Sequence, residues 1–319
     1  MITLGLDTSN YTTSAALYDS TTGVLVQKKQ LLPVKEGELG LRQSDAVFHH
    51  TRQLPDIVEA LFAAVNEQGL PADFSAVGAS SRPCETEGSY MPCFLVGEGL
   101  ARSVSAANAL PLFAFSHQQG HVAAAAFGAG RLDLLDKPFL AFHVSGGTTE
   151  ILRVTPGDNG VPHCEKLGGS LDLKAGQLID RVGGMLGLSF PAGSALEQVA
   201  LTVPELKKAD RPHIKTEAGG CHLSGIENQC KKLLADGKEP AFVARYCLYA
   251  VYLAVKGLTE AALAATGELP VVYAGGVMSN GIIREKLEAD FGGVFARPEF
   301  SSDNACGIAV LTARAAENL

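Results

Sequence analysis

The chain contains two copies of one local pattern, and this internal repeat restricts its fold more than any other sequence feature. The first copy has short apolar runs at 2–7, 13–18 and 24–28, and the second has them at 139–144, 149–154 and 163–167. Each copy predicts a three-stranded meander. A repeated meander followed by helical segments predicts an α/β protein with two similar lobes of mixed sheet, flanked by helices and meeting at a central cleft. Two unrelated hairpins of similar composition are the alternative.

The rest of the pattern places helices and strands around the two meanders. We expect strands at 74–80, 112–115 and 270–274, and helices at 44–66, 92–110, 174–186, 194–201, 241–266 and from about 280. We expect a loop-rich stretch at 202–238, and a last helix that ends near 316 and is capped by Ser302 or Asp303. The repeat predicts an N-terminal lobe over 1–135 and a C-terminal lobe over 136–319.

Two turns of the repeat have the composition of phosphate-binding loops. Ser145-Gly146-Gly147-Thr148-Thr149 can direct several backbone N–H groups at one point, and glycine allows a phosphate to approach closely. Asp7-Thr8-Ser9 is its counterpart in the first copy, with a carboxylate able to hold a metal or a water. We expect the two turns to form a clamp for the phosphates of one nucleotide.

Two further features suit the nucleoside part of such a ligand. Gly275-Gly276 ends a predicted strand, where an adenosine can lie against the backbone; an ordinary strand-to-helix turn is the alternative. Asp180 lies on a predicted helix and could hold ribose hydroxyls, although an isolated Asp is more often a solvated surface charge.

His117 and His121 are four residues apart, so on a helix their side chains lie on one face about 5–6 Å apart, as one metal ion requires. Asp303, at a predicted helix start, is the best candidate for a third ligand, and Asp7 could act directly or through water. Two imidazoles and a carboxylate suit iron, zinc or manganese. A zinc protease would need Glu in place of Gln118 as the general base, so protease activity is disfavoured.

Other classes of protein are disfavoured by composition. The formal net charge of −8 gives no general basic face for nucleic acid, so a nucleic-acid substrate would need a local patch or a partner. The seven cysteines include no C-x-x-C pair, which indicates free thiols in a reducing cytoplasm. No P-loop or dinucleotide-binding glycine motif occurs in the required context. We expect no signal peptide and no membrane span.

Several of these motifs together resemble the TsaD/Gcp family, once described as O-sialoglycoprotein endopeptidases. The resemblance rests on Gly5-Leu-Asp-Thr-Ser9, His117/His121, Val144-Ser-Gly-Gly147, Asp180-Arg-Val182, Leu186–Gly193, Gly275–Asn280 and Ser302-Asp-Asn304, which follow in the family's order and spacing. The family is similar in fold to actin, Hsp70 and the sugar kinases. Its members transfer a threonylcarbamoyl group from threonylcarbamoyl-adenylate to adenine 37 of tRNAs that read codons beginning with A.

The resemblance implies a role for each matching residue. The metal, iron or zinc, would be bound by His117, His121 and Asp303, with Asp7 also at the catalytic site. ATP or threonylcarbamoyl-adenylate would be contacted by Ser9, Val144, Ser145, Gly146, Gly147, Thr148, Asp180, Gly193, Gly275, Gly276 and Asn280. The implied partners are an adenine nucleotide, tRNA, and TsaB-like and TsaE-like proteins of the same pathway.

The chain also departs from the family's pattern. Thr148 replaces a His, Leu173 an Asp, Gln177 a Glu and Glu227 a Lys, and Arg82-Pro-Cys-Glu85 replaces Arg-Gly-Pro-Gly. These changes indicate a divergent paralogue that keeps nucleotide and metal binding. We therefore expect a tRNA threonylcarbamoyltransferase. A carbamoyltransferase or ATPase acting on a small molecule, and a non-catalytic nucleotide-binding scaffold, are the alternatives.

Overall fold

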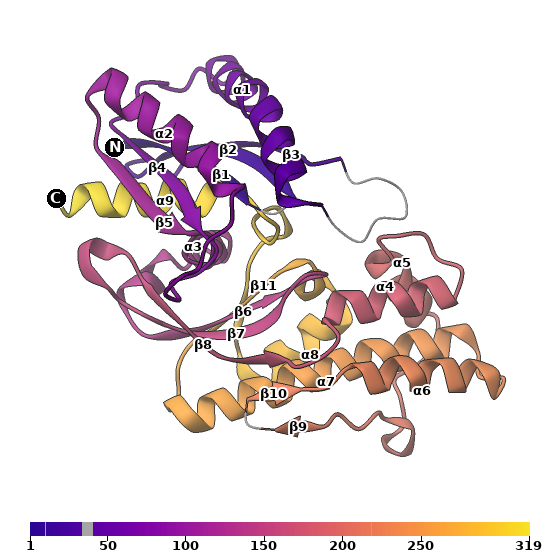
Figure 1. Ribbon diagram of the computed structural model, residues 1–319. Coiled ribbons are helices and arrows are strands. Elements are labelled where there is room, and N and C mark those ends of the chain that lie inside the picture. The colour runs from indigo at the N-terminus through magenta and orange to yellow at the C-terminus, as the bar shows by residue number, and fades with distance from the viewer. Residues whose placement is uncertain (10, 34–40, 218) are drawn as a thin grey trace. The chain divides into compact units, whose positions relative to one another are not determined.

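The computed structural model describes residues 1–9, 11–33, 41–217 and 219–319, which divide into two compact units (Figure 1). Unit 1 is Met1–Lys137 with Thr155–Cys164 and Asp303–Leu319, and unit 2 is Pro138–Val154 with Glu165–Ser302. This division differs from the predicted one, which placed the whole of 136–319 in the C-terminal lobe. The last helix belongs to unit 1 because it packs on the sheet of that unit.

Unit 1 is built on a five-stranded sheet in the order β3-β2-β1-β4-β5. Its strands are β1 (Ile2–Ser9), β2 (Thr12–Asp19), β3 (Leu25–Leu31), β4 (Ala76–Arg82) and β5 (Leu112–Ser116). The first three form the predicted antiparallel meander, and β4 and β5 run parallel to β1. Asn10, in the predicted first turn, lies outside the described residues.

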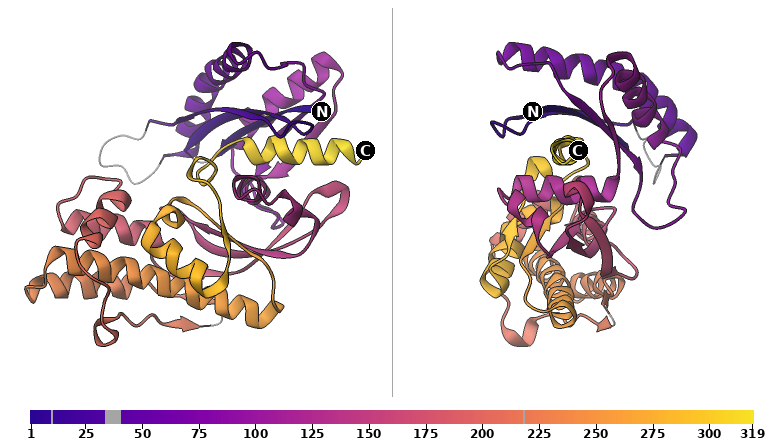
Figure 2. Two further views of the ribbon diagram at one scale, coloured as in Figure 1. Left: turned by 180° about the vertical axis from the view of Figure 1, so that it is seen from behind. Right: turned by 90° about the vertical axis from the view of Figure 1, so that its left-hand side faces the viewer.

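Helices cover both faces of this sheet. On one face lie α1 (Gln43–Glu67), which continues through Pro55, and α2 (Phe94–Asn108); on the other lie α3 (His117–Gly128) and α9 (Cys306–Glu317) (Figure 2). The short helix η1 (Leu132–Asp136) follows α3. Because alternate residues of a strand face opposite sides, Thr3 and Asp7 of β1 face α9, and Thr3 Oγ1 donates to the carbonyl of Ala309.

Glycine allows α9 to approach its neighbours closely. A Cβ on Gly307 would lie 1.8 Å from the carbonyl oxygen of Gly120 in α3, and one on Gly5 of β1 would lie 2.4 Å from the backbone nitrogen of Ala309. Real Cβ atoms do not come so close to backbone, so both contacts require glycine. This packing brings the segment that precedes α9 beside α3.

Unit 2 repeats the plan on a seven-stranded sheet in the order β12-β11-β6-β7-β8-β10-β9. Its strands are β6 (Phe139–Val144), β7 (Thr149–Thr155), β8 (His163–Ser170), β9 (Thr216–Glu217), β10 (Gly220–Cys221), β11 (Val271–Ala274) and β12 (Val294–Phe295). The antiparallel pair β6–β7, with β11 parallel to β6, matches the antiparallel pair β1–β2 with β4 parallel to β1. The predicted duplication is therefore present in the strand pairing.

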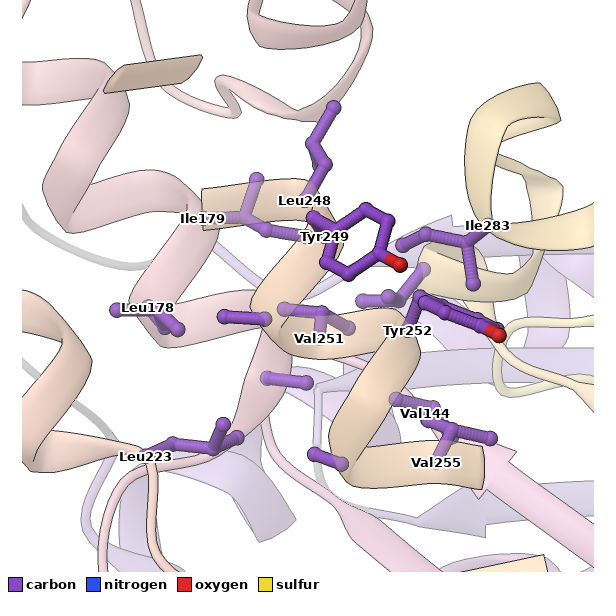
Figure 3. Close-up of a cluster of buried hydrophobic side chains, with 14 of the residues drawn as sticks. Val144, Leu178, Ile179, Leu223, Leu248, Tyr249, Val251, Tyr252, Val255 and Ile283 are labelled. Carbon is purple, nitrogen blue, oxygen red and sulfur yellow. The ribbon is translucent and has the colours of Figure 1, made fainter. Parts of the chain in front are cut away.

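The helices of unit 2 pack around one large apolar cluster. They are α4 (Ala175–Met185), α5 (Gly193–Leu201), α6 (Ser224–Ala235), α7 (Pro240–Thr266) and α8 (Gly281–Phe291), and the short helices of the chain's second half are η2 (Asp158–Gly160), η3 (Lys208–Asp210), η4 (Gly276–Ser279) and η5 (Pro298–Phe300). Val144 of β6, Ile179 of α4 and Val251 of α7 belong to this cluster (Figure 3). Among the described helices, α7 alone has the length and apolar composition of a membrane span, but most of that window is buried in the protein, as in a core helix.

The predicted loop at 202–238 is wrong in its second half, where α6 forms. Ile226 and Cys230 give α6 a buried face, and the side chain of Asp172 caps its start from 51 residues away by accepting the N–H of Leu223. A cap supplied from so far along the chain leaves no local sequence signal. Ser224, which we expected in a solvated loop, is the first residue of this helix and donates its hydroxyl to Asp172.

The predicted cap of the last helix is also wrong. α9 begins at Cys306, and no side-chain hydrogen bond caps it from Ala305, the residue before it. Asn304 Oδ1 instead accepts the N–H of Cys306. Asp303 is not available for this role because its carboxylate faces His117 and His121.

Candidate metal centre and nucleotide-binding turns

The start of α3 places the first histidine at the edge of the sheet in unit 1. Ser116 ends β5 and caps α3: its hydroxyl accepts the N–H of Gln119, and the Gln119 side chain accepts the N–H of Ser116. His117 is therefore the first residue of the helix and His121 lies one turn later on the same face. Their ring centroids are 4.2 Å apart.

Asp303 completes the group that the sequence predicted. Its Oδ1 lies 3.1 Å from His121 Nε2 and 3.5 Å from His117 Nε2. One ligand atom from each of the three residues lies within 4.8 Å of the others. Two ligands bound to one tetrahedral zinc at about 2.0–2.2 Å lie about 3.3–3.6 Å apart, so distances of 3.1 and 3.5 Å are close to those around a single ion.

Asp7 lies behind this group and contacts one of its members. Its Oδ2 is 3.0 Å from His117 Nδ1 and accepts the Ser9 hydroxyl at 3.0 Å, while its Oδ1 accepts the Ser80 hydroxyl at 2.5 Å. Asp7 is 1% exposed and both of its oxygens have partners. A carboxylate on Nδ1 holds the histidine with Nε2 directed at the metal, a common arrangement around metal sites.

Ser80 was missed by the sequence analysis. It lies in β4, which runs parallel to β1, so the two strands present their carboxyl ends at the same edge of the sheet. That topology was the available signal, since the run 74–80 was expected as a strand but no partner was assigned to it.

The charge of the group also suits a divalent cation. Burial disfavours the protonated form of His117, but the Asp7 carboxylate and the hydrogen bonds with Asp303 and Asp7 raise its pKa to about 10. Burial likewise disfavours the ionised form of Asp303, yet His117 and His121 hold the pKa of this carboxyl well below its usual value. Two carboxylates beside two imidazoles thus form a partly buried site that favours positive charge, which a divalent metal would supply.

The corresponding turn of unit 2, between β6 and β7, exposes backbone rather than side chains. Ser145 and Thr148 close it: the N–H of Ser145 donates to the Thr148 carbonyl, and the N–H of Thr148 donates to the Ser145 hydroxyl. Gly146 and Gly147 between them are exposed, and a Cβ on either would meet no atom within 4 Å. The backbone of this turn is therefore open to a ligand.

Backbone packing on the other side of the turn is tight. A Cβ on Gly176, in α4, would lie 2.6 Å from the nitrogen of Gly146, and one on Gly275 would lie 2.2 Å from the carbonyl oxygen of Val144. Gly275 also has φ +101°, which favours glycine. The start of α4 and the β11–η4 turn, which includes Gly276, are therefore held against the β6–β7 turn.

The remaining predicted nucleotide contacts lie in unit 2, at the starts of α5 and α8 and in the middle of α4. Asp180 Oδ1 accepts the N–H of Ala192, next to Gly193 at the start of α5. Asn280 caps α8 by accepting the N–H of Ile283. Glu197 of α5 accepts the N–H of Gly281, which ties the starts of α5 and α8. The prediction that the turns of the two units clamp one nucleotide stays a prediction.

Four of the residues that depart from the family's pattern have definite places in the structure. Leu173 is buried in the apolar core, and Gln177 lies in the first turn of α4. Glu227 forms ion pairs with Arg181 and Lys231, so its negative charge is neutralised within the protein. Glu85 accepts the N–H of Cys164, which anchors the 82–85 loop.

Comparison with solved structures defines the class of protein. The chain is similar to the Acidaminococcus fermentans (R)-2-hydroxyglutaryl-CoA dehydratase component A (14% identity, 99% of each chain, TM-score 0.56). It is also similar to full-length HypF in its phosphate- and nucleotide-bound form (14% identity, 99% of this chain and 46% of that one, TM-score 0.58). Identities this low establish the fold alone. It is the predicted two-lobed α/β fold of the actin, Hsp70 and sugar-kinase ATPases.

The particular family follows from the sequence itself. Residues 35–310 match TsaD, the tRNA N6-adenosine threonylcarbamoyltransferase. The chain therefore belongs to the TsaD family, as its motifs predicted, and family membership indicates a transferase.

Proposed function

We propose that this protein transfers the threonylcarbamoyl group of threonylcarbamoyl-adenylate to N6 of adenine 37 in tRNA, with a divalent metal held by His117, His121 and Asp303. The observation that carries the proposal is the meeting of these three side chains, which are up to 186 positions apart in the chain, at the spacing of ligands on one ion. In the reaction, N6 attacks the carbamoyl carbon, the bond from that carbon to the phosphate oxygen breaks, AMP leaves, and N6 loses a proton.

The residues of unit 1 prepare the metal centre. Asp7 holds His117 through Nδ1 and so directs Nε2 at the metal, and Ser9 and Ser80 hold Asp7. We therefore assign Asp7, which the sequence analysis placed among the catalytic residues, to positioning. A bound divalent metal would act as a Lewis acid toward the carbamoyl and phosphate oxygens.

The residues of unit 2 bind the adenylate in this proposal. The exposed backbone of Gly146 and Gly147 would contact the phosphate, because glycine leaves no side chain to obstruct it. The backbone at Gly275 and Gly276 would lie against the adenosine, and Asp180 would hold the ribose through Oδ2, since its Oδ1 already accepts the N–H of Ala192.

The acceptor in this proposal is tRNA, which a chain of net charge −8 would bind over a local patch or with partner proteins. TsaB-like and TsaE-like proteins are the partners that we propose. Glu227, where the family's pattern has a Lys, does not present an unpaired negative charge to a tRNA, because Arg181 and Lys231 form ion pairs with it.

The test is mass spectrometry of tRNA nucleosides. The metal-loaded protein, with and without partner proteins, is incubated with threonylcarbamoyl-adenylate and unmodified tRNA that reads codons beginning with A. We expect threonylcarbamoyladenosine to form, none with tRNA that carries guanosine at position 37, and none with His117→Ala. His163→Ala, which changes an exposed histidine of unit 1, is the matched control and should keep the activity.

Two other outcomes would replace the proposal. Cleavage of the adenylate with no modified nucleoside would favour a carbamoyltransferase or ATPase that acts on a small molecule. Binding of the adenylate without turnover, in the presence of metal and partners, would favour a nucleotide-binding scaffold.

A further inference from the structure

Three cationic side chains of unit 2 gather around one exposed carboxylate, and none of these residues belongs to a motif discussed above. Lys286 of α8 forms an ion pair with Glu205, and Arg245 Nη2 of α7 lies 3.8 Å from it. These two residues, with Arg211 in addition, lower the pKa of Glu205, and Lys286 has the largest effect. The Glu205 side chain is 57% exposed, so this carboxylate lies at the surface.

A buried aromatic ring holds two of these cations. The guanidinium carbon of Arg211 lies 5.1 Å from the ring centroid of Tyr249, and Lys286 Nζ lies 5.5 Å from it. The Tyr249 ring extends from α7 beside Ile283 of α8 (Figure 3) and is 6% exposed. A cation within about 6 Å of a ring centroid is attracted to the ring, so Tyr249 helps to keep these two positive charges together.

Arg245 has unused capacity to donate hydrogen bonds. It is 8% exposed, and among the described residues its guanidinium has Glu205 at 3.8 Å as its ionic partner and forms no hydrogen bond. A guanidinium has five N–H donors, and no Arg245 nitrogen is among the fully buried atoms without a partner in the described part of the chain, so these donors can reach a ligand.

We propose that Arg211, Arg245, Lys286 and Tyr249 form a phosphate-binding site, and that the Glu205 carboxylate lies in the place of the phosphate when the ligand is absent. Three cations facing one carboxylate leave two positive charges uncompensated. A phosphate group brings up to two negative charges and three acceptor oxygens, and an arginine can bind it through two parallel hydrogen bonds. Exposed ion pairs contribute little stability, so the ligand displaces Glu205 easily.

The phosphate can belong to a free phosphorylated compound or to the backbone of tRNA. Both present the same oxygens to the site. The second source would provide the local cationic patch that a chain of net charge −8 needs to bind a polyanion.

Calorimetric titration with inorganic phosphate tests the site. Lys286→Met should weaken phosphate binding by at least about tenfold, and Glu205→Gln should strengthen it about three- to tenfold because the competing charge is removed. Lys256→Met is the matched control: this lysine also lies over a tyrosine of α7 but pairs with Asp290, so phosphate affinity should change less than about twofold. The proposal would be overturned if wild type, Lys286→Met and Glu205→Gln bound phosphate with the same affinity. It would also be overturned if neither wild type nor Glu205→Gln bound phosphate.

Titration of the same variants with tRNA at two salt concentrations identifies the source. Shifts in tRNA affinity in the same directions as the shifts in phosphate affinity assign the site to the nucleic-acid backbone. Shifts in phosphate affinity alone assign it to a free phosphorylated compound. Neither result depends on whether the protein transfers a threonylcarbamoyl group, so the two proposals can fail separately.

Discussion

The first hairpin turn of unit 1 and its counterpart in unit 2 occupy the same place in the repeat but present different chemistry. The β1–β2 turn follows Asp7, Thr8 and Ser9, whose side chains are at most 1% exposed. The β6–β7 turn presents Gly146 and Gly147, which are exposed and have open space around them. The first turn therefore follows buried polar side chains, whereas the second presents exposed glycine backbone.

This comparison shows that two copies of one strand pattern can carry turns of different chemistry. A buried carboxylate needs hydroxyl and imidazole partners, which β1, β4 and α3 supply from one sheet edge. A glycine turn needs open space on its exposed side and close packing on its other side. Here α4 and the β11–η4 turn supply that packing. Mutations should therefore affect metal binding in unit 1 and nucleotide binding in unit 2.

The largest effect is expected at the metal ligands. His117→Ala should reduce metal affinity by more than about 100-fold, because it removes a ligand rather than a residue that supports one. Metal content after dialysis, measured by mass spectrometry, should fall from one equivalent to almost none, while His163→Ala keeps the full equivalent. Unchanged metal content in His117→Ala would refute the site.

The glycines of unit 2 give the next effect. Gly275→Ala should destabilise the protein by about 3 kcal/mol, because φ is +101° and a Cβ would clash with the Val144 carbonyl. Gly147→Ala should change stability by less than about 1 kcal/mol, since the space is open, yet it should weaken adenylate binding. Chemical denaturation and calorimetry separate the two results. If both substitutions destabilised the protein equally, Gly275 would not differ from Gly147 in how tightly its surroundings are packed.

Asp7→Asn tests the positioning role of the buried carboxylate. Loss of the charge behind His117 should lower metal affinity by about 10–100-fold, the usual cost of removing a group that orients a metal ligand. Asp133→Asn, which changes an exposed carboxylate of unit 1, should leave metal affinity unchanged. A loss as complete as that of His117→Ala would instead make Asp7 a ligand.

Asp172 of unit 2 differs from Asp7 of unit 1, because its carboxylate caps a helix instead of orienting a metal ligand. Asp172→Ala should destabilise the protein by about 1–2 kcal/mol, since α6 loses its cap, while Asp236→Ala at the other end of α6 should change stability by less than about 0.5 kcal/mol. Burial opposes ionisation of Asp172, but the Ser224 hydroxyl and the N–H groups of Leu223, Leu173 and Ser224 lower its pKa. Its contribution is therefore complete above the unfolded pKa of about 4 and is lost as pH falls through the folded pKa. Denaturation of wild type and Asp172→Ala should show a difference that shrinks below pH 4; a constant difference would contradict this role.

Local patterns were enough to predict most of the fold. Alternating apolar runs predicted both meanders, and the spacing of His117 and His121 predicted a metal pair that Asp303 joins. The contacts between residues far apart in the sequence, which hold the site and the helices in place, could not be predicted. Ser80 reaches Asp7 through strand pairing, Asp172 caps a helix 51 residues further on, and Gly120 meets Gly307 where two helices cross. Such contacts depend on tertiary packing, which no sequence window contains.

The most direct test of the metal centre is anomalous diffraction from crystals loaded with zinc or iron. We expect one strong peak about 2.0–2.2 Å from His117 Nε2, His121 Nε2 and Asp303 Oδ1, with Asp7 bound to His117 Nδ1 and outside the ligand set. A peak on cysteine sulfur, or an ion coordinated by Asp7 without His117, would contradict the account.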